Sequence, residues 1–149
     1  MNVTGYRIGD RVRVIRSVCH CGQEITFEHL GRMGGDAVKI AGAVLYREEL
    51  ERAMRALARY VLDYRLVARE DMVAGAPRGM VALQILPTPL LRARSDAERF
   101  LADAFAAELY VTPTRTLADL LRKGTFASLE VVFVGSFPPQ AKAVKLKKG

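Results

Sequence analysis

The spacing of apolar residues changes at Arg47, and this change most restricts the folds open to the chain. Residues 10–16, "DRVRVIR", alternate charged and branched apolar side chains, as in a strand with one face buried. After Arg47 the apolar residues recur at helical spacing, which predicts a helix over about residues 47–62. The stripe consists of Leu50, Met54, Leu57 and Val61. A chain with both periods is neither all-helical nor all-β, and it combines helices with a sheet.

The first part of the chain predicts two hairpins. Residues 24–31, "EITFEHLG", repeat the period of two, so they are expected to pair with residues 10–16 through the "SVCHCGQ" turn. The pattern of the first strand places Val12 and Val14 on its buried face. "DAVKIAGAVLY" then predicts two short strands around Gly42, because glycine permits a tight turn.

The second part of the chain predicts two strands, two helices and a last strand. "YRLVARE" and "GMVALQILPT" are strand-like, and "DMVAGAPR" between them is expected to be a loop. "SDAERFLADAFAAELYV" begins with a capping-box pattern, Ser95 to Glu98, and places Phe100, Leu101 and Phe105 at helical spacing. "RTLADLLRKG" predicts a short helix ending at Gly124, and "ASLEVVFVGS" a final strand.

The predicted fold is α+β, with a small sheet that carries helices packed on one face and is preceded by a β-hairpin. The sheet is expected from residues near 64–69, 79–87 and 128–135. The predicted division is an N-terminal hairpin and hinge segment, residues 1–35, followed by an α+β domain, residues 36–149.

Composition limits the partners. The 149 residues are half apolar and carry a net charge of +7, and clustered basic residues attract phosphate. However, several lysines lie at the C-terminal end, and many arginines alternate with acids on predicted helices, so a nucleic-acid partner is not expected.

No apolar run reaches the roughly 20 residues of a membrane helix, and no signal-peptide layout follows Met1. A cytoplasmic protein without a membrane partner is expected.

The two cysteines lie in "VCHCGQ", as Cys19 and Cys21 around His20. Two cysteines one residue apart on an extended chain point to opposite faces, which disfavours a disulfide and fits a reducing compartment. Three adjacent ligands cannot all reach one ion, and a fourth is missing, so a pair of free thiols is favoured over zinc.

Several charged and glycine residues recur in a pattern that resembles a known superfamily. Gly31-Arg32, Asp36, Lys39, Gly42 and "ELE" at 49–51 resemble a motif of the AMP-forming acyl-CoA synthetase and adenylation enzymes. "GYRIGD" at 5–10 is similar to the "YRTGD" upstream of that motif, and "GSFPPQAKAVKLKK" to the family's closing stretch. "CHCG" and "GD-AVK" look most like the phenylacetate-CoA ligase and coenzyme F390 synthetase branch.

The resemblance implies a C-terminal lid domain that acts with a large N-terminal adenylation domain on ATP, CoA and a carboxylic acid. Phenylacetate or another aryl acid would be such a substrate, and Mg²⁺ would be bound mainly by the large domain. It assigns Asp10 and Arg32 to the ATP ribose, Lys142 or Lys145 to adenylation, and the segment with Lys39 and Gly42 to the CoA tunnel. The glycine-rich "RMGGD" is a candidate hinge for rotation of the lid.

Two departures affect this assignment. Gly35 takes the place of an acidic residue and one residue is added after Arg32, so the hinge residue stays open. Ala141 stands where glycine is usual, so the adenylation lysine is either Lys142, favoured by its distance from Pro138, or Lys145. A second hypothesis is a stand-alone α+β module whose basic tail binds a protein or nucleic acid.

Overall fold

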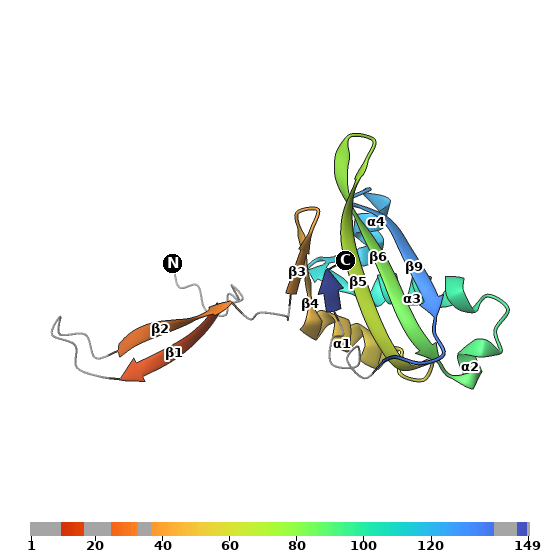
Figure 1. The fold of residues 1–149 in the computed structure, drawn as a ribbon, viewed down its shortest axis with the longest axis horizontal. Coiled ribbons are helices and arrows are strands. Elements are labelled where there is room, and N and C mark those ends of the chain that lie inside the picture. The colour runs from red at the N-terminus through yellow and green to blue at the C-terminus, as the bar shows by residue number, and fades with distance from the viewer. Residues whose placement is uncertain (1–9, 17–24, 33–36, 139–145, 149) are drawn as a thin grey trace. The chain divides into compact units, whose positions relative to one another are not determined.

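The computed structural model describes residues 10–16, 25–32, 37–138 and 146–148, with side chains for Val14 and residues 37–138 (Figure 1). The chain divides into two compact units, Met1–Gly34 and Gly35–Gly149.

The first unit contains one antiparallel strand pair, β1 (Asp10–Arg16) and β2 (Ile25–Arg32). The register pairs Arg16 with Ile25 at one end and Asp10 with Arg32 at the other, and it shifts between Asp10 and Val12. The predicted hairpin strands are confirmed. The predicted burial is wrong for Val14, which is 55% exposed, because two strands alone offer few atoms to cover a side chain.

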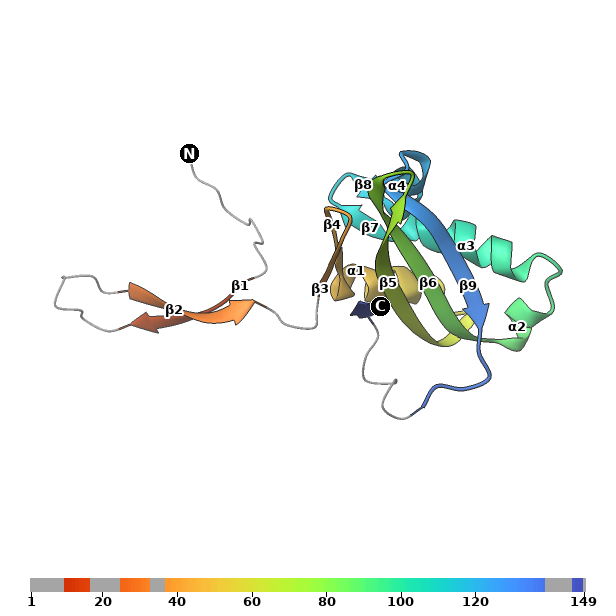
Figure 2. The ribbon, with the colours of Figure 1, turned by 45° about the horizontal axis from the view of Figure 1, so that its top comes forward.

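The second unit is built on a four-stranded mixed sheet in the order β10-β5-β6-β9. β5 (Val61–Val73) and β6 (Ala76–Pro87) pair antiparallel, whereas β9 (Phe126–Phe133) lies parallel to β6 and β10 (Leu146–Lys148) parallel to β5. Both long helices, α1 (Arg47–Ala56) and α3 (Ala97–Glu108), cover the same face of this sheet (Figures 1 and 2). The predicted α+β class is confirmed.

The remaining elements are short and lie around this framework. Two small hairpins and two short helices complete the unit: β3 (Ala37–Ile40) with β4 (Ala43–Tyr46), β7 (Tyr110–Thr112) with β8 (Arg115–Thr116), α2 (Pro89–Arg92) and α4 (Leu117–Arg122). α4 begins with a reciprocal capping box, in which Thr116 and Asp119 satisfy each other's backbone N–H groups. The backbone N–H of Thr116, followed by its hydroxyl, donates to the Asp119 carboxylate and so lowers the pKa of Asp119.

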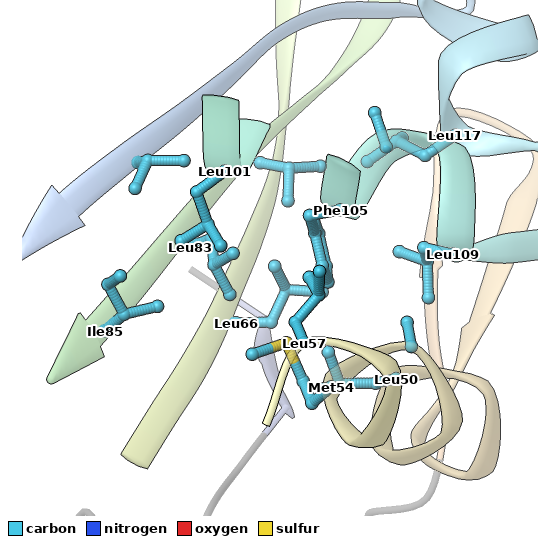
Figure 3. Close-up of a cluster of buried hydrophobic side chains, with 14 of the residues drawn as sticks. Leu50, Met54, Leu57, Leu66, Leu83, Ile85, Leu101, Phe105, Leu109 and Leu117 are labelled. Carbon is cyan, nitrogen blue, oxygen red and sulfur yellow. The ribbon is translucent and has the colours of Figure 1, made fainter. Parts of the chain in front are cut away.

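The core lies between the sheet and the two long helices (Figure 3). The sheet contributes Leu66, Leu83 and Ile85, each fully buried. The helical side contributes Leu50, Met54, Leu57, Leu101, Phe105 and Leu109. Both predicted apolar stripes therefore face the sheet, with Phe100 half-buried at the edge of the core.

The predicted end of the first helix and the predicted capping box at Ser95 are wrong. α1 ends at Ala56, and Val61 is the first residue of β5, because the N–H of Leu57 turns back to Met54 and the β-branched Val61 pairs with Pro87 instead. α3 begins after Asp96, which makes no side-chain cap. Asp96 instead binds Arg94, with 2.9 Å between Oδ1 and Nε, which lowers the pKa of this exposed carboxyl.

The predicted loop at residues 71–78 is also wrong, because β5 and β6 continue to a two-residue turn. Ala74 and Gly75 have φ angles of 52° and 78°, as a type I′ hairpin turn requires. Ala41 and Gly42 between β3 and β4 repeat this turn, with φ angles of 46° and 79°. The tetrapeptides "IAGA" and "VAGA" thus form the same structure in two hairpins.

Among the glycines of residues 37–138, Gly79 has the least room for a side chain. A Cβ atom there would lie 2.5 Å from two ring carbons of Phe126, whose side chain is only 1% exposed. We therefore expect Gly79→Ala to lower the free energy of unfolding by about 1–3 kcal/mol through overpacking. Gly135→Ala is the matched control, since no atom lies within 4 Å of its Cβ position, and urea unfolding of both variants checks the difference. Equal stability of the two variants would contradict this packing.

Candidate functional site

The structure brings Asp10 and Arg32 together at one end of the first unit. They are register partners at the open end of the β1–β2 pair, so their backbones lie opposite each other. These residues, separated by more than twenty positions in the sequence, are the two assigned to one ligand group by the motif resemblance.

Lys39 and Gly42 lie together on the β3–β4 hairpin of the second unit. Lys39 pairs with Val44 and is exposed, whereas its neighbour Ile40 is fully buried. This alternation follows from the period of two in a strand, which turns one face of the hairpin to the core and presents Lys39 on the other. Gly42 is exposed at the tip, and no atom lies within 4 Å of the position of a Cβ.

Lys142 and Lys145 lie outside the described residues, as do Cys19, His20, Cys21 and residues 33–36 of the candidate hinge, which begins at Arg32. Their assigned roles stay predictions. The tail itself holds one element that sequence reasoning missed: β10, directly after Lys145, is a parallel edge strand beside Leu66–Ala68 of β5.

The acids of the "ELE" stretch are used in ion pairs along α1. Glu49 Oε2 lies 2.8 Å from Arg52 Nε, and Glu51 Oε1 lies 2.8 Å from Arg47 Nε. The hydrogen bond that Arg52 Nε donates to Glu49 raises the pKa of Arg52, whose guanidinium also donates to the carbonyl of Glu108. These contacts stabilise the helix and its junction with α3.

A residue that sequence reasoning missed holds the hairpin turn. Glu70 Oε2 on β5 accepts a hydrogen bond of 2.5 Å from the backbone N–H of Ala41. No local pattern could reveal this contact, because the two residues lie 29 positions apart in the sequence. Lys39 and Gly42 thus lie on a hairpin whose turn is hydrogen-bonded to β5 of the sheet.

Two hollows of the second unit lie away from this hairpin. One, of about 470 Å³, is open and lined by the residues that lead into α3, among them Arg92, Arg94 and Arg99. Another, of about 280 Å³, lies between α1 and the start of β5, beside Met54 and Tyr64. Burial there raises the pKa of Tyr64. Neither hollow includes Lys39 or Gly42, and both residues are exposed.

Among the described residues, no group of three or more His, Cys, Asp or Glu side chains is placed to hold a metal ion. Within the same residues, no helix has the length and apolar character needed to cross a membrane.

No protein-family model matches the chain, and no curated protein matches it. Among solved structures, 2-hydroxyisobutyryl-CoA ligase with 2-HIB-AMP and CoA in the thioesterification state is similar, with 17% identity and a TM-score of 0.52 over 94% of this chain and 27% of that one. The same ligase in the postadenylation state with 2-HIB-AMP has 18% identity and a TM-score of 0.50, and the match covers 95% of this chain and 28% of the ligase. A domain of phenylacetate-coenzyme A ligase from Bacteroides vulgatus ATCC 8482 has 14% identity and a TM-score of 0.48, and the match covers 76% of this chain and 92% of that domain.

At these identities the likeness to 2-hydroxyisobutyryl-CoA ligase shows a shared fold. The chain spans 27–28% of the length of that ligase. The structure and the comparison therefore agree that this chain has the α+β fold found in a portion of a CoA ligase.

Proposed function

We propose that this chain is the C-terminal lid domain of an AMP-forming carboxylate-CoA ligase, acting with a large N-terminal adenylation domain. The observation that carries the proposal is the β3–β4 hairpin, which presents Lys39 and Gly42 together on an exposed edge. The order of the sequence motifs and the fold shared with 2-hydroxyisobutyryl-CoA ligase both support it. This chain joined to the proposed large domain is called the complete ligase.

The proposed roles divide between two half-reactions. Adenylation brings a carboxylate to the α-phosphate of ATP, so a positioned cation is needed to offset the charge that develops. Lys142 or Lys145 is proposed for this, with Asp10 and Arg32 at the ribose of ATP or AMP. Rotation of the lid would then bring Lys39 and Gly42 beside the path of the CoA thiol.

The geometry of Gly42 fits that second role. A narrow path for a thiol needs backbone without a side chain, and the open space beside Gly42 meets this need. Mg²⁺, which would accompany ATP, is proposed to bind mainly to the large domain.

We propose the phenylacetate-CoA ligase branch, and an aryl acid such as phenylacetate as the substrate class, from "CHCG" and "GD-AVK" in the sequence. A cytoplasmic location is part of the same proposal, because ATP and CoA are then at hand and the two cysteines would stay reduced.

The isolated chain tests whether adenylation needs the large domain. Because the proposed phosphate side of the site belongs to the large domain, we expect the purified 149-residue chain to give no pyrophosphate exchange with ATP and phenylacetate. The complete ligase measured under the same conditions is the positive control. Exchange by the isolated chain above the level without enzyme would refute the lid assignment.

A further inference from the structure

We propose that Glu70 and Gly79 are positioning residues that hold the β3–β4 turn and so set the place of Lys39 and Gly42 in the thioester-forming step. The inference rests on the proposed function of this hairpin. Its own basis is a set of contacts between the turn and the long β5–β6 hairpin.

Glu70 holds the turn through its backbone. In a two-residue hairpin the flanking residues, here Ile40 and Ala43, form the hydrogen-bonded pair, and the N–H of the first turn residue is left without a partner in the ladder. That residue is Ala41, and its N–H donates to Glu70 Oε2 at 2.5 Å. A hydrogen bond to a carboxylate is stronger than one to a neutral acceptor. This bond stabilises a conformation that alanine rarely adopts, with φ at 46°.

Gly79 restrains the turn indirectly, because it leaves room for the side chain of Ile40, the residue before the turn. A Cβ atom at Gly79 would lie 3.0 Å from Cγ2 of Ile40 and 2.5 Å from the ring of Phe126. The absent side chain therefore leaves the space in which Ile40 packs, fully buried, against β6 and β9. The N–H of Gly79 donates to the carbonyl of Thr125 at 3.0 Å, which fixes this point of β6 to the start of β9.

The two contacts come from one cross-strand pair. Glu70 and Gly79 are direct register partners on β5 and β6, two positions beyond the buried pair Ala68 and Val81. The period of two places both pairs on the same face of the sheet, which is the face that carries the helices. The turns of both hairpins also point the same way in both views (Figures 1 and 2).

The held residues are adjacent to the candidate site residues. Ile40 and Ala41 lie between Lys39 and Gly42 in the chain, so fixing the first two restricts the second two. A shift of about 1 Å in a reacting group can slow a step roughly a hundredfold. The Glu70–Gly79 pair thus gives a projecting hairpin the rigidity that a thiol path requires.

The test compares Glu70→Ala with Glu70→Gln, which keeps an acceptor oxygen, and with Glu130→Ala as the matched control. Glu130 is an exposed acid on β9 in the same sheet. In the 149-residue chain, amide hydrogen exchange at Ala41 should become about tenfold faster in Glu70→Ala, change less in Glu70→Gln and stay unchanged in Glu130→Ala. In the complete ligase, CoA thioester formation from preformed phenylacetyl-adenylate should fall about tenfold in Glu70→Ala and recover with glutamine, while adenylation stays within about twofold.

The outcomes separate this inference from the proposed function. Faster exchange at Ala41 with an unchanged thioester rate would overturn the positioning role, and the lid assignment would stand if Gly42→Leu still blocks that step. An equal loss of both half-reactions would point to a general structural defect and also overturn the positioning role. A complete ligase that forms no thioester even with Glu70 intact would refute the proposed function itself, and the positioning role would fall with it.

Discussion

Gly42→Leu in the complete ligase is expected to slow thioester formation from preformed acyl-adenylate by at least about a hundredfold while adenylation changes little. Gly42 lies at the exposed tip of the β3–β4 turn with open space around it, so a leucine side chain would project into the proposed path of the thiol. Adenylation is expected to precede the rotation that brings this tip to the reaction. Measuring the two half-reactions separately checks the prediction.

Gly75→Leu is the matched control. Gly75 holds the same position in the second "AGA" turn, with φ at 78° against 79° for Gly42, and nothing lies within 4 Å of either Cβ position. Both variants therefore carry the same backbone strain of about 1–2 kcal/mol for an L-residue in the left-handed region. Only obstruction of the thiol path distinguishes them. Equal losses in the two variants would show that the strain, and not the site, causes the effect.

Lys142→Ala in the complete ligase is expected to slow adenylation by at least about a hundredfold, because it removes a charge-assisted contact to the reacting carboxylate and phosphate. Thioester formation from preformed acyl-adenylate should barely change. The reason is the proposed rotation, which would carry this lysine away before CoA reacts.

Lys145→Ala is measured beside it, since either lysine fits the closing motif. If Lys145→Ala is the variant that loses adenylation, the register moves by three residues and the mechanism is kept. If neither variant slows adenylation, the lid interpretation of the C-terminal tail is wrong and a stand-alone binding module becomes the better hypothesis.

The sequence predicted the elements whose apolar period is long and uniform. The stripe of Leu50, Met54 and Leu57 and the stripe of Leu101 and Phe105 both face the sheet, because a helix in this class is stabilised by burying its apolar face. The β3–β4 hairpin was also predicted, since Gly42 lies between two short alternating runs.

The two strands were predicted, but the full length and the tight turn of the β5–β6 hairpin were missed because this turn breaks a usual preference. Ala74 adopts a positive φ that alanine rarely takes, and Pro77 lies inside β6 beside this turn, so "DMVAGAPR" resembled a loop. The edge strand β10 was missed because three residues with two lysines carry no strand signal of their own. Its pairing with β5 depends on tertiary contact across many intervening residues.

The candidate site divides in the same way. Motif spacing singled out Asp10, Arg32, Lys39 and Gly42, and the structure places the first two opposite each other and the last two on one hairpin. Spacing could not identify Glu70, because its contact with Ala41 exists only once β5 lies beside the hairpin. Residues that position a site from a different element are visible only in the folded chain.

The most direct test of the lid assignment is to measure both half-reactions of the large domain with and without this chain. We predict that CoA thioester forms from preformed acyl-adenylate only when residues 1–149 are present, joined to the large domain or added to it, and that the rate saturates as the added chain is increased. Thioester formation at the same rate by the large domain alone, or no thioester at any concentration of the chain, would refute the lid assignment.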